Sequence, residues 1–568
     1  MRLHRIRESA IKKGLNLQEN PDTLPGKGFV VIQVDGLPFY ILEKAMERGY
    51  APFMRKLVRE EGHALHRFMC GLPSTTTSFQ LGVMYGEDNL APGFRWLDKD
   101  GESIITTKNF ADVQKLESEI SSRGIRGILE RGSSYVNVFS GGAQRSLFTL
   151  SKMVDSLVPV MARMRDILIL FLVNIGIGWR LLLFSLLESA RDILDRARSR
   201  LTGKPSCAGG LLFPVIRAVT NVILKEIATV ATVTDIGRGV PFIFTTYISY
   251  DEMAHSRGPE SKAAFKEIKA IDRRIKRIYK AIRRKNPRGY DLFILSDHGQ
   301  IPTVPFESYF GESIREFLVR NSAMGVEAHS LGPEGEAQLS KLLSFINQMR
   351  HLESLLPKPL RPFCERFIRK LWRRAPGGWP RLNWKSAEQI FVVPTGGMAH
   401  VYFNFKKDKA SFEEIEGRYP GLIRAIAGHP GIRCVVSSSG DGVLVMSSRG
   451  DIRIDGRVRI SGRNPLGDLP GFRGILGEIE KLAAMRNSGD LIIFGGRKNG
   501  FMFSFANELS GHGGIEPEEQ DSFVIAPPDV GFPFGSIGGR RDLYNFFSSY
   551  SRPSLLEDIG PEVRRAAP

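Results

Sequence analysis

Three segments of the chain are short, almost wholly apolar runs that end in an acidic residue. They cover residues 28–36 (GFVVIQVDG), 240–251 (ending TTYISYD) and 290–299 (YDLFILSDHG). Apolar runs of this length, most of them bounded by glycine, are typical of buried strands in a parallel sheet. The pattern therefore predicts three parallel strands that end near Asp35, Asp251 and Asp297.

Histidines accompany two of these strand ends. His255 follows Asp251 by one helical turn, and His298 follows Asp297 directly. In open α/β sheets, ligand-binding groups gather beyond the carboxyl ends of the strands, and Asp and His are ligands that zinc prefers. A single Asp at a strand end is commonly a turn or a helix cap. Three such Asp residues, together with two histidines at the spacing of metal ligands, instead favour a metal centre.

The hydrophobic pattern changes along the chain. Residues 166–189 and 211–233 form apolar helical patterns that interrupt the α/β alternation, and residues 451–460 alternate around Asp455-Gly456, which indicates a hairpin. We expect a catalytic core in three segments, separated by two inserted regions and preceded by a leader. In chain order these are a basic leader (1–27), the first core segment (28–150), a hydrophobic helical insertion (151–234), the second core segment (235–310), a cap-like α+β subdomain (311–487), and the third core segment with a C-terminal tail (488–568).

Composition and charge narrow the class of protein. The 568 residues suffice for two or more domains, and the formal net charge is +18. Basic residues concentrate in 272–288 and 361–374, and individually they are expected on the solvated face of an amphipathic helix. Their summed charge still favours anionic partners such as phosphorylated substrates or anionic lipid. Nucleic acid is the least favoured of these partners, because no recognition motif stands out. Four scattered cysteines without a CxxC pair predict a reducing compartment.

One apolar stretch bears on localisation. Residues 167–187 (ILILFLVNIGIGWRLLLFSLL) are long enough to cross a bilayer core, but Asn174 and Arg180 interrupt them. The basic N-terminal sequence lacks the apolar region of a signal peptide. Two alternatives stay open: a hairpin in the membrane interface, and a helix pair buried against the core or a dimer partner. We expect a cytoplasmic enzyme associated peripherally with the inner face of the membrane; the oligomeric state stays open.

A run of hydroxyl residues precedes a predicted helix in residues 70–86 (CGLPSTTTSFQLGVMYG). A hydroxyl at a helix N-terminus is often only a cap. Close to metal ions, the same position also suits a nucleophile, because the helix dipole and the metals favour its ionised form.

Five motifs in chain order carry a family resemblance. They are V-D-G (34–36), P-S-T-T-T (73–77), D-E-x-x-H (251–255), S-D-H-G (296–299) and G-H-G-G (511–514). In this order they resemble the alkaline phosphatase superfamily, and within it the type I phosphodiesterase/nucleotide pyrophosphatase branch. The resemblance implies an α/β fold: an alkaline-phosphatase-like core with a mainly parallel central sheet flanked by helices, here with a helical insertion and an α+β cap subdomain.

The resemblance also implies the roles of the site residues. Two divalent metal ions, with zinc favoured, would be bound by seven residues in two sets. Asp251, His255 and His512 would bind one ion, and the other ion would be bound by Asp35, Thr76, Asp297 and His298. Thr76 matches the family nucleophile, which forms a phosphothreonine intermediate, and Thr75 is the reserve candidate. Two such ions would clamp the phosphoryl group of a phosphate-ester substrate.

The sequence departs from the family pattern next to the nucleophile. Phe79 replaces an asparagine that helps to hold a phosphoryl oxygen in the family, and Gln80 is either a substitute donor or an ordinary helix residue. Arg145 is a candidate for contacting the substrate anion, and Glu252 is expected to be a neighbour rather than a ligand. The remaining histidines that we considered lack ligand spacing, and we expect structural or surface roles for them: His63, His66, His400 and His429.

These observations favour a two-metal phosphoric ester hydrolase, a phosphodiesterase or nucleotide pyrophosphatase. The nearest alternative is a phosphomonoesterase or phosphomutase of the same superfamily. The sulfatase pattern Cys-x-Pro-x-Arg is absent from residues 70–74, which disfavours a sulfatase. A non-catalytic scaffold protein at the membrane surface is also disfavoured, because every expected ligand is present.

Overall fold

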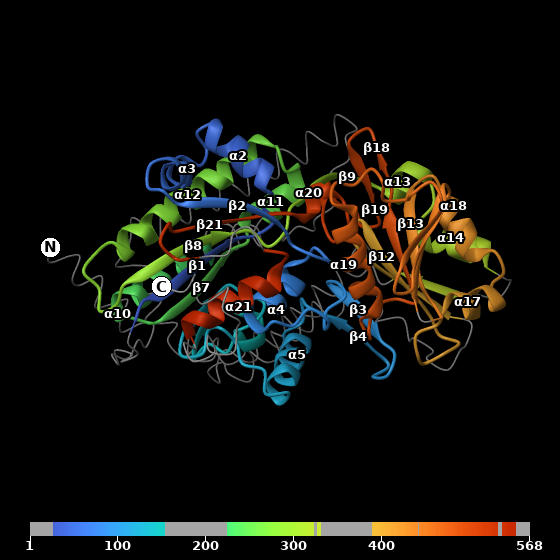
Figure 1. The fold of residues 1–568 in the computed structure, drawn as a ribbon, viewed down its shortest axis with the longest axis horizontal. Helices are drawn as coiled ribbons and strands as arrows, with labels where there is room; N and C mark the ends of the chain where they lie inside the picture. The colour runs from blue at the N-terminus through green and yellow to red at the C-terminus, as the bar shows by residue number, and fades with distance from the viewer. Residues whose placement is uncertain are drawn as a thin grey trace, which may run out of the picture.

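A computed structural model describes residues 26–153, 224–322, 327–330, 389–440, 442–531 and 537–551. Figure 1 shows two lobes, each built on its own sheet. Much of the expected leader (1–25), helical insertion (154–223) and cap (331–388) lies outside the described residues, as does the apolar stretch 167–187. Within the described ranges, no helix is both long enough and apolar enough to cross a membrane.

The first lobe is built on a seven-stranded, mainly parallel sheet, which confirms the expected fold class. Its strand order is β2-β21-β8-β1-β7-β5-β6, and the five strands from β8 to β6 run parallel. The bounds are β1 Gly28–Val34, β2 Ala64–Met69, β5 Ser133–Tyr135, β6 Arg145–Leu147, β7 Phe242–Tyr247, β8 Tyr290–Leu295 and β21 Asp521–Ala526.

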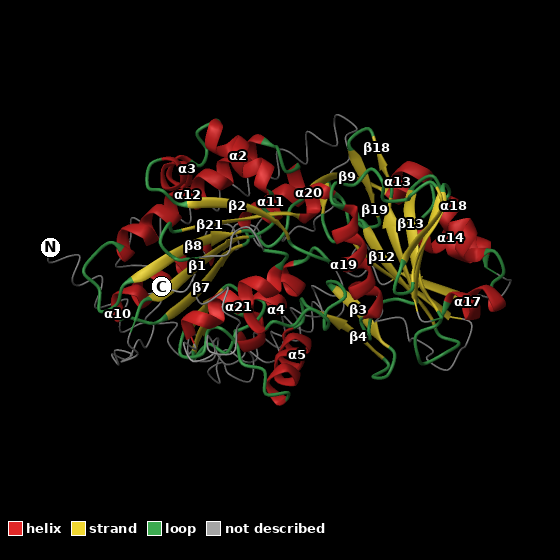
Figure 2. Ribbon diagram, in the orientation of Figure 1, coloured by secondary structure: helices red, strands yellow, loops and turns green. Residues whose placement is uncertain are grey.

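Alternate residues of the buried strands face two different cores. In β1, Val30, Ile32 and Val34 join one apolar cluster, whereas Phe29 and Val31 join the other. The first core lies under α2 (Phe39–Glu47), α3 (Pro52–Arg59), α10 (Lys225–Arg238), α11 (Ser249–Arg257) and α12 (Lys262–Ile282). The second lies against α4 (Thr76–Tyr85), α5 (Phe110–Ser122) and α21 (Arg540–Ser551). Helices therefore cover both faces of the sheet, which suits strands that are apolar on both sides (Figure 2).

The second lobe is built on an eight-stranded sheet, drawn in yellow to red-orange on the right of Figure 1. Its order is β10-β11-β12-β17-β13-β14-β15-β16, and each pair except β10 with β11 is antiparallel. The bounds are β10 Glu327–Ser330, β11 Gln389–Thr395, β12 Met398–Phe403, β13 Ile432–Ser439, β14 Gly442–Met446, β15 Gly450–Ile454, β16 Val458–Gly462 and β17 Leu491–Gly495. The expected hairpin at Asp455-Gly456 joins β15 to β16, and Gly456 has the positive φ that such a turn requires.

Helices cover this second sheet as well. Three of them contribute to one apolar cluster: α14 (Ile314–Asn321), α17 (Phe412–Arg418) and α18 (Leu422–Gly428). Helix α19 (Phe472–Ala484) contributes to a separate cluster with residues of β13, β14 and β17.

The boundary expected at residue 488 does not match the sheets. Strand β17 pairs with β12 and β13 in the second lobe, whereas we expected residues 488–568 to belong to the catalytic core. The chain returns to the first lobe only through β20 (Ser510–Gly511) and β21. A small sheet, β18-β19-β9-β20, lies along this path, formed by β18 (Arg497–Lys498), β19 (Phe501–Ser504), β9 (Ile301–Pro305) and β20.

Five shorter elements remain to be placed among the described residues. Strands β3 (Arg95–Asp98) and β4 (Ser103–Thr106) form a separate antiparallel pair. Shorter helical segments are the 3₁₀ turn Leu150–Lys152, α13 (Phe306–Phe310) and α20 (Pro517–Gln520).

Candidate metal centre and active site

The seven candidate site residues lie at the carboxyl ends of the central strands. Asp35 directly follows β1, and Asp297 and His298 follow β8. Strand β7 ends at Tyr247, four residues earlier than expected, so Asp251 and His255 lie one turn apart on α11 rather than at the end of a strand. This difference arises because the apolar run continues into the first turn of the helix.

The first donor group joins residues from two distant regions of the chain. Asp251, His255 and His512 each offer a donor atom, and these atoms lie within 4.8 Å of one another. His255 Nε2 is 3.4 Å from Asp251 Oδ2, and His512 Nε2 is 3.7 Å from Asp251 Oδ1. This is the set that the sequence resemblance implied for one metal.

Ser74 holds His512 beside the hydroxyl motif. His512 Nδ1 is 2.7 Å from the Ser74 carbonyl oxygen, and the Gly513 amide donates to Ser74 Oγ over 2.8 Å. The main-chain contact leaves Nε2 of the His512 ring directed at Asp251. The loop 511–514 therefore lies next to the start of α4.

The second donor group lies next to the first. Asp35, Asp251 and His298 have donor atoms within 4.8 Å of one another, so Asp251 is common to both groups. Asp297 lies beside this group: its Oδ2 is 3.5 Å from His298 Nε2, and its Oδ1 accepts the Gly36 amide over 3.0 Å. The structure thus brings the expected acidic and histidine ligands of this region together with Asp251.

Thr76 is the first residue of α4 and points at the second group. Its Oγ1 donates to Asp35 Oδ1 over 3.1 Å and lies 3.3 Å from His298 Nε2. Thr75, the reserve candidate, is instead the N-cap of α4; its side chain accepts the Ser78 amide and donates to Ser78 Oγ. Of the two hydroxyls, Thr76 is the one that contacts the candidate metal ligands.

The electrostatics of the cluster fit divalent cations. Burial, followed by the negative charges of Asp297 and Asp251, raises the pKa of Asp35 well above its ordinary value. Oδ2 of the fully buried Asp297 has no hydrogen-bond partner among the described residues. Crowded carboxylates with an unpaired buried oxygen, next to histidine ring nitrogens, match the oxygen and nitrogen ligands of divalent zinc.

Neighbouring charges also shift the pKa values of the residues in the first donor group. Burial opposes the ionised form, but the charge of His255 and its hydrogen bond outweigh burial and lower the pKa of Asp251 far below its usual range. Burial lowers the pKa of His255, but Asp251 and Glu508 outweigh it and raise that pKa well above its ordinary value. Burial and the neighbouring His298 lower the pKa of His512.

A glycine permits the close approach of the two groups. Gly36 has φ +67°, and a Cβ atom there would lie 2.5 Å from Asp251 Oδ1 and 2.9 Å from Gln300 Nε2. The V-D-G motif therefore needs glycine both for its backbone conformation and for space.

Sequence reasoning missed a layer of supporting residues. Gln300 Nε2 donates to Asp251 Oδ1, and Gln300 Oε1 accepts from Ser510 Oγ over 2.6 Å. The Ser510 carbonyl lies 2.7 Å from His255 Nδ1, and Glu508 Oε2 lies 3.2 Å from the same nitrogen. Pairing of Ser510 with Pro302, between β20 and β9, brings these segments together. Their only signal in the sequence is proximity to the S-D-H-G and G-H-G-G motifs.

Other candidates lie away from the site. The fully buried Gln80 amide donates to Gln33, Asn137 and Thr246 and accepts the Val138 amide, so it is committed to the core beneath α4. Phe79 is buried against Phe68. Gln80 therefore does not replace the family asparagine in this structure.

The other polar residues considered from the sequence also lie outside the two donor groups. Arg145 lies at the start of β6 and pairs with Ser133 of β5, which in turn pairs with Ile243 near the start of β7. The donor groups lie beyond the other ends of these parallel strands, so Arg145 is on the opposite edge of the sheet. Glu252 is exposed on α11. None of the histidines expected to be structural belongs to a donor group found among the described residues: His63, His66, His400 and His429.

Comparison with known proteins confirms the resemblance. The family model described as type I phosphodiesterase / nucleotide pyrophosphatase matches residues 196–416, a range that includes Asp251, His255, Asp297 and His298. No curated protein sequence matches the chain.

Two solved structures illustrate the structural similarity. A phosphonoacetate hydrolase from Sinorhizobium meliloti 1021, in complex with phosphonoacetate, is 12% identical with a TM-score of 0.43, over 93% of this chain and 96% of that chain. Murine ectonucleotide pyrophosphatase/phosphodiesterase 5 is 10% identical with a TM-score of 0.44, over 95% of this chain and 96% of that chain.

Proposed function

We propose that this protein is a two-metal phosphoric ester hydrolase that cleaves phosphodiesters or pyrophosphates through a phosphothreonine on Thr76. The observation that carries the proposal is the position of the Thr76 hydroxyl. It lies at the first residue of α4, within hydrogen-bond distance of both Asp35 and His298. The family resemblance, which implies the same chemistry, supports it.

Asp251, His255 and His512 would hold one divalent ion, and Asp35, Thr76, Asp297 and His298 the other, with zinc as the favoured metal. When bound, such ions lower the pKa of a coordinated hydroxyl and neutralise charge on the phosphoryl oxygens.

The chain's own residues position the reaction. Thr76 Oγ1 attacks phosphorus: its O–H bond breaks and an Oγ1–P bond forms, while the bond to the leaving oxygen breaks and that oxygen takes up the proton. The first N–H groups of α4 and the positive end of its dipole lie beside Thr76 and stabilise negative charge on the phosphoryl oxygens. Water then attacks phosphorus, the Oγ1–P bond breaks, and the Thr76 hydroxyl is restored.

The experiment compares bis(p-nitrophenyl) phosphate with p-nitrophenyl phosphate, each with and without a chelator. We expect faster turnover of the diester and loss of both activities on metal removal. Rapid quenching followed by mass spectrometry should detect a p-nitrophenyl phosphoryl group on Thr76 with the diester, and a phosphate group on Thr76 with the monoester. A clear preference for the monoester would contradict the proposed diester or pyrophosphate specificity, and turnover that survives complete metal removal would contradict the two-metal mechanism.

A further inference from the structure

The outer face of α12 carries a continuous line of cations. Their spacing alternates between four and three residues, so they follow one face of the helix from its first turn to its C-cap. At 1.5 Å per residue the line is about 32 Å long. We call it the basic stripe: Lys262, Lys266, Lys269, Arg273, Lys276, Lys280 and Arg283. All seven are exposed except Lys269, which is half-buried over the Tyr50 ring.

The basic stripe lies between two packed flanks of the same helix. On one flank, Asp272 accepts the Phe53 and Met54 amides at the start of α3. On the other, Arg274 and Arg277 form ion pairs with Glu226 of α10, at 3.4 Å and 2.5 Å. The basic stripe therefore lies on the solvent-facing side of the helix.

The positive charge of the basic stripe is balanced only in part, by the Asp272 carboxylate near Arg273 and Lys276. Within the part of the chain that the structure describes, no ion pair joins any of the seven cations to a carboxylate, whereas Arg274 and Arg277 on the neighbouring flank are paired. Like charges three and four residues apart destabilise a helix. Exposed Arg55 and Arg59 on α3 add to the positive charge of this side. Such a surface attracts an extended anionic partner.

The path of the chain next to α12 indicates which kind of anionic partner this surface binds. It leaves the described structure after Met153 and returns at Leu224, directly before α10. Lys225 forms an ion pair with Glu267 of α12, and Glu226 pairs with Arg274, so the point of return is fixed against the stripe-bearing helix. The intervening residues 154–223 contain the apolar stretch 166–189 and the first part of the stretch 211–233, whose last residues belong to α10. A basic face next to long apolar sequence fits an anionic lipid surface better than nucleic acid.

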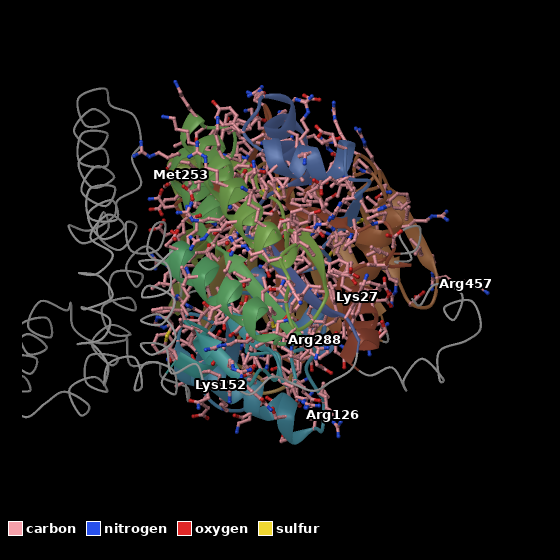
Figure 3. The ribbon with its side chains drawn as sticks, turned by 90° about the vertical axis from the view of Figure 1, so that its left-hand side faces the viewer. Lys27, Arg126, Lys152, Met253, Arg288 and Arg457 are labelled. Atoms are coloured by element: carbon pink, nitrogen blue, oxygen red, sulfur yellow. The ribbon has the colours of Figure 1, made fainter. Side chains whose placement is uncertain are left out.

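We propose that the basic stripe of α12, together with α3, is the face by which this protein docks on an anionic lipid membrane. Figure 3 shows the side of the first lobe that carries α10 and α12, with Arg457 of the second lobe on the opposite side of the view.

The test is co-sedimentation of the full chain with vesicles of phosphatidylcholine alone or with about a third phosphatidylglycerol, at low salt and in 0.5 M NaCl, where charge attraction is screened. The stripe variant is Arg273→Glu/Lys276→Glu/Lys280→Glu. The matched control is Lys407→Glu/Arg457→Glu/Arg473→Glu, which makes the same change of charge at exposed cations of the second lobe.

We expect wild type and control to pellet with the anionic vesicles at low salt and the stripe variant to lose at least tenfold in partitioning. The corresponding glutamine variant, which changes less charge, should show a smaller loss and guards against misfolding. Equal pelleting of wild type and stripe variant, or wild-type binding to duplex DNA without binding to vesicles, would overturn the proposal. Turnover of the diester is measured separately, so a failure of the proposed catalytic function is distinguishable from a failure of docking.

Discussion

Buried histidines in the two lobes have opposite surroundings. In the second lobe, His400 of β12 is fully buried, and both of its ring nitrogens meet the main chain: Nε2 lies 2.8 Å from the Pro92 carbonyl, and Nδ1 accepts the Gly489 amide over 3.0 Å. In the first lobe, His512 uses only Nδ1 on the main chain, and its Nε2 faces Asp251. Burial alone therefore does not mark a ligand; a ring nitrogen left facing carboxylates does.

The same contrast holds for buried carboxylates. Asp490 in the second lobe accepts the Phe403 and Ala410 amides and pairs with Lys99. Asp297 in the first lobe keeps one oxygen without a hydrogen-bond partner among the residues that the structure describes. The second lobe satisfies these buried polar groups within the protein. The first lobe leaves them open on one side, which is what a bound cation requires.

Replacing the nucleophile should have the largest effect. Thr76→Ala removes the only hydroxyl proposed to attack phosphorus, so we expect a loss of turnover of roughly 10³-fold or more. Metal content, measured by elemental analysis, should stay above one ion per chain.

Thr75→Ala is the control for this change. It removes the N-cap of α4 at a cost of about 1 kcal/mol in stability and should retain most activity. Near wild-type turnover of Thr76→Ala would reverse the assignment of the nucleophile.

The comparison of histidines is tested directly by His512→Ala. We expect the affinity for the first metal to fall at least about 100-fold and the rate to fall with it, because one of the three proposed ligands is lost. Calorimetric titration of the chelator-treated protein measures this affinity.

His400→Gln is the matched change in the second lobe. It should lower the melting temperature while leaving metal affinity unchanged, because the hydrogen bonds of His400 go to the main chain. A loss of metal affinity in this variant would break the distinction between the two histidine environments.

Removing support from Asp251 should have a smaller effect. Gln300→Met keeps the side-chain volume but loses the donor to Asp251 and the acceptor for Ser510. We expect metal affinity to fall about 10- to 100-fold, as for other residues that orient metal ligands. Ser510→Ala, which removes one contact of Gln300, should give a weaker loss; unchanged metal affinity in both would show that Asp251 does not need this support.

The pH dependence of stability should show the smallest effect. Burial lowers the pKa of His400 from 6.5 to about 4. The unfolded chain therefore binds a proton before the folded protein does, and stability falls as the pH drops from about 6.5 towards 4. Between pH 7 and pH 5.5 this amounts to about 1 kcal/mol.

Denaturant unfolding of wild type and His400→Gln at both pH values isolates this contribution. The stability of the wild type should decline more steeply on acidification than that of the variant. Parallel declines would mean that His400 is not kept neutral by burial.

Much of the site could be predicted because its residues follow apolar runs with distinct patterns. Asp35, Asp297 and His298 follow strands that the sequence delimits, and helix α4 begins at the expected hydroxyl run. The end of β7 could not be placed, because TTYISY is a run of strand-forming and largely buried residues that continues from the strand into the first turn of α11.

Long-range pairings explain the rest. Gln300 and Ser510 meet only because β9 pairs with β20, across about two hundred residues of sequence, and no local pattern encodes that pairing. The apolar run of β17 likewise predicts a buried strand but carries no information about which of two sheets it joins.

The place of β21 in the central sheet has a consequence for biosynthesis. This late strand inserts between β2 and β8, which come from much earlier in the chain. Until residues 521–526 have left the ribosome, β8 presents an open edge and β2 has no neighbour, so the nascent sheet is exposed to mispairing. His512 also arrives only shortly before β21, so the donor group of Asp251, His255 and His512 cannot form until this late part of the chain has been synthesised.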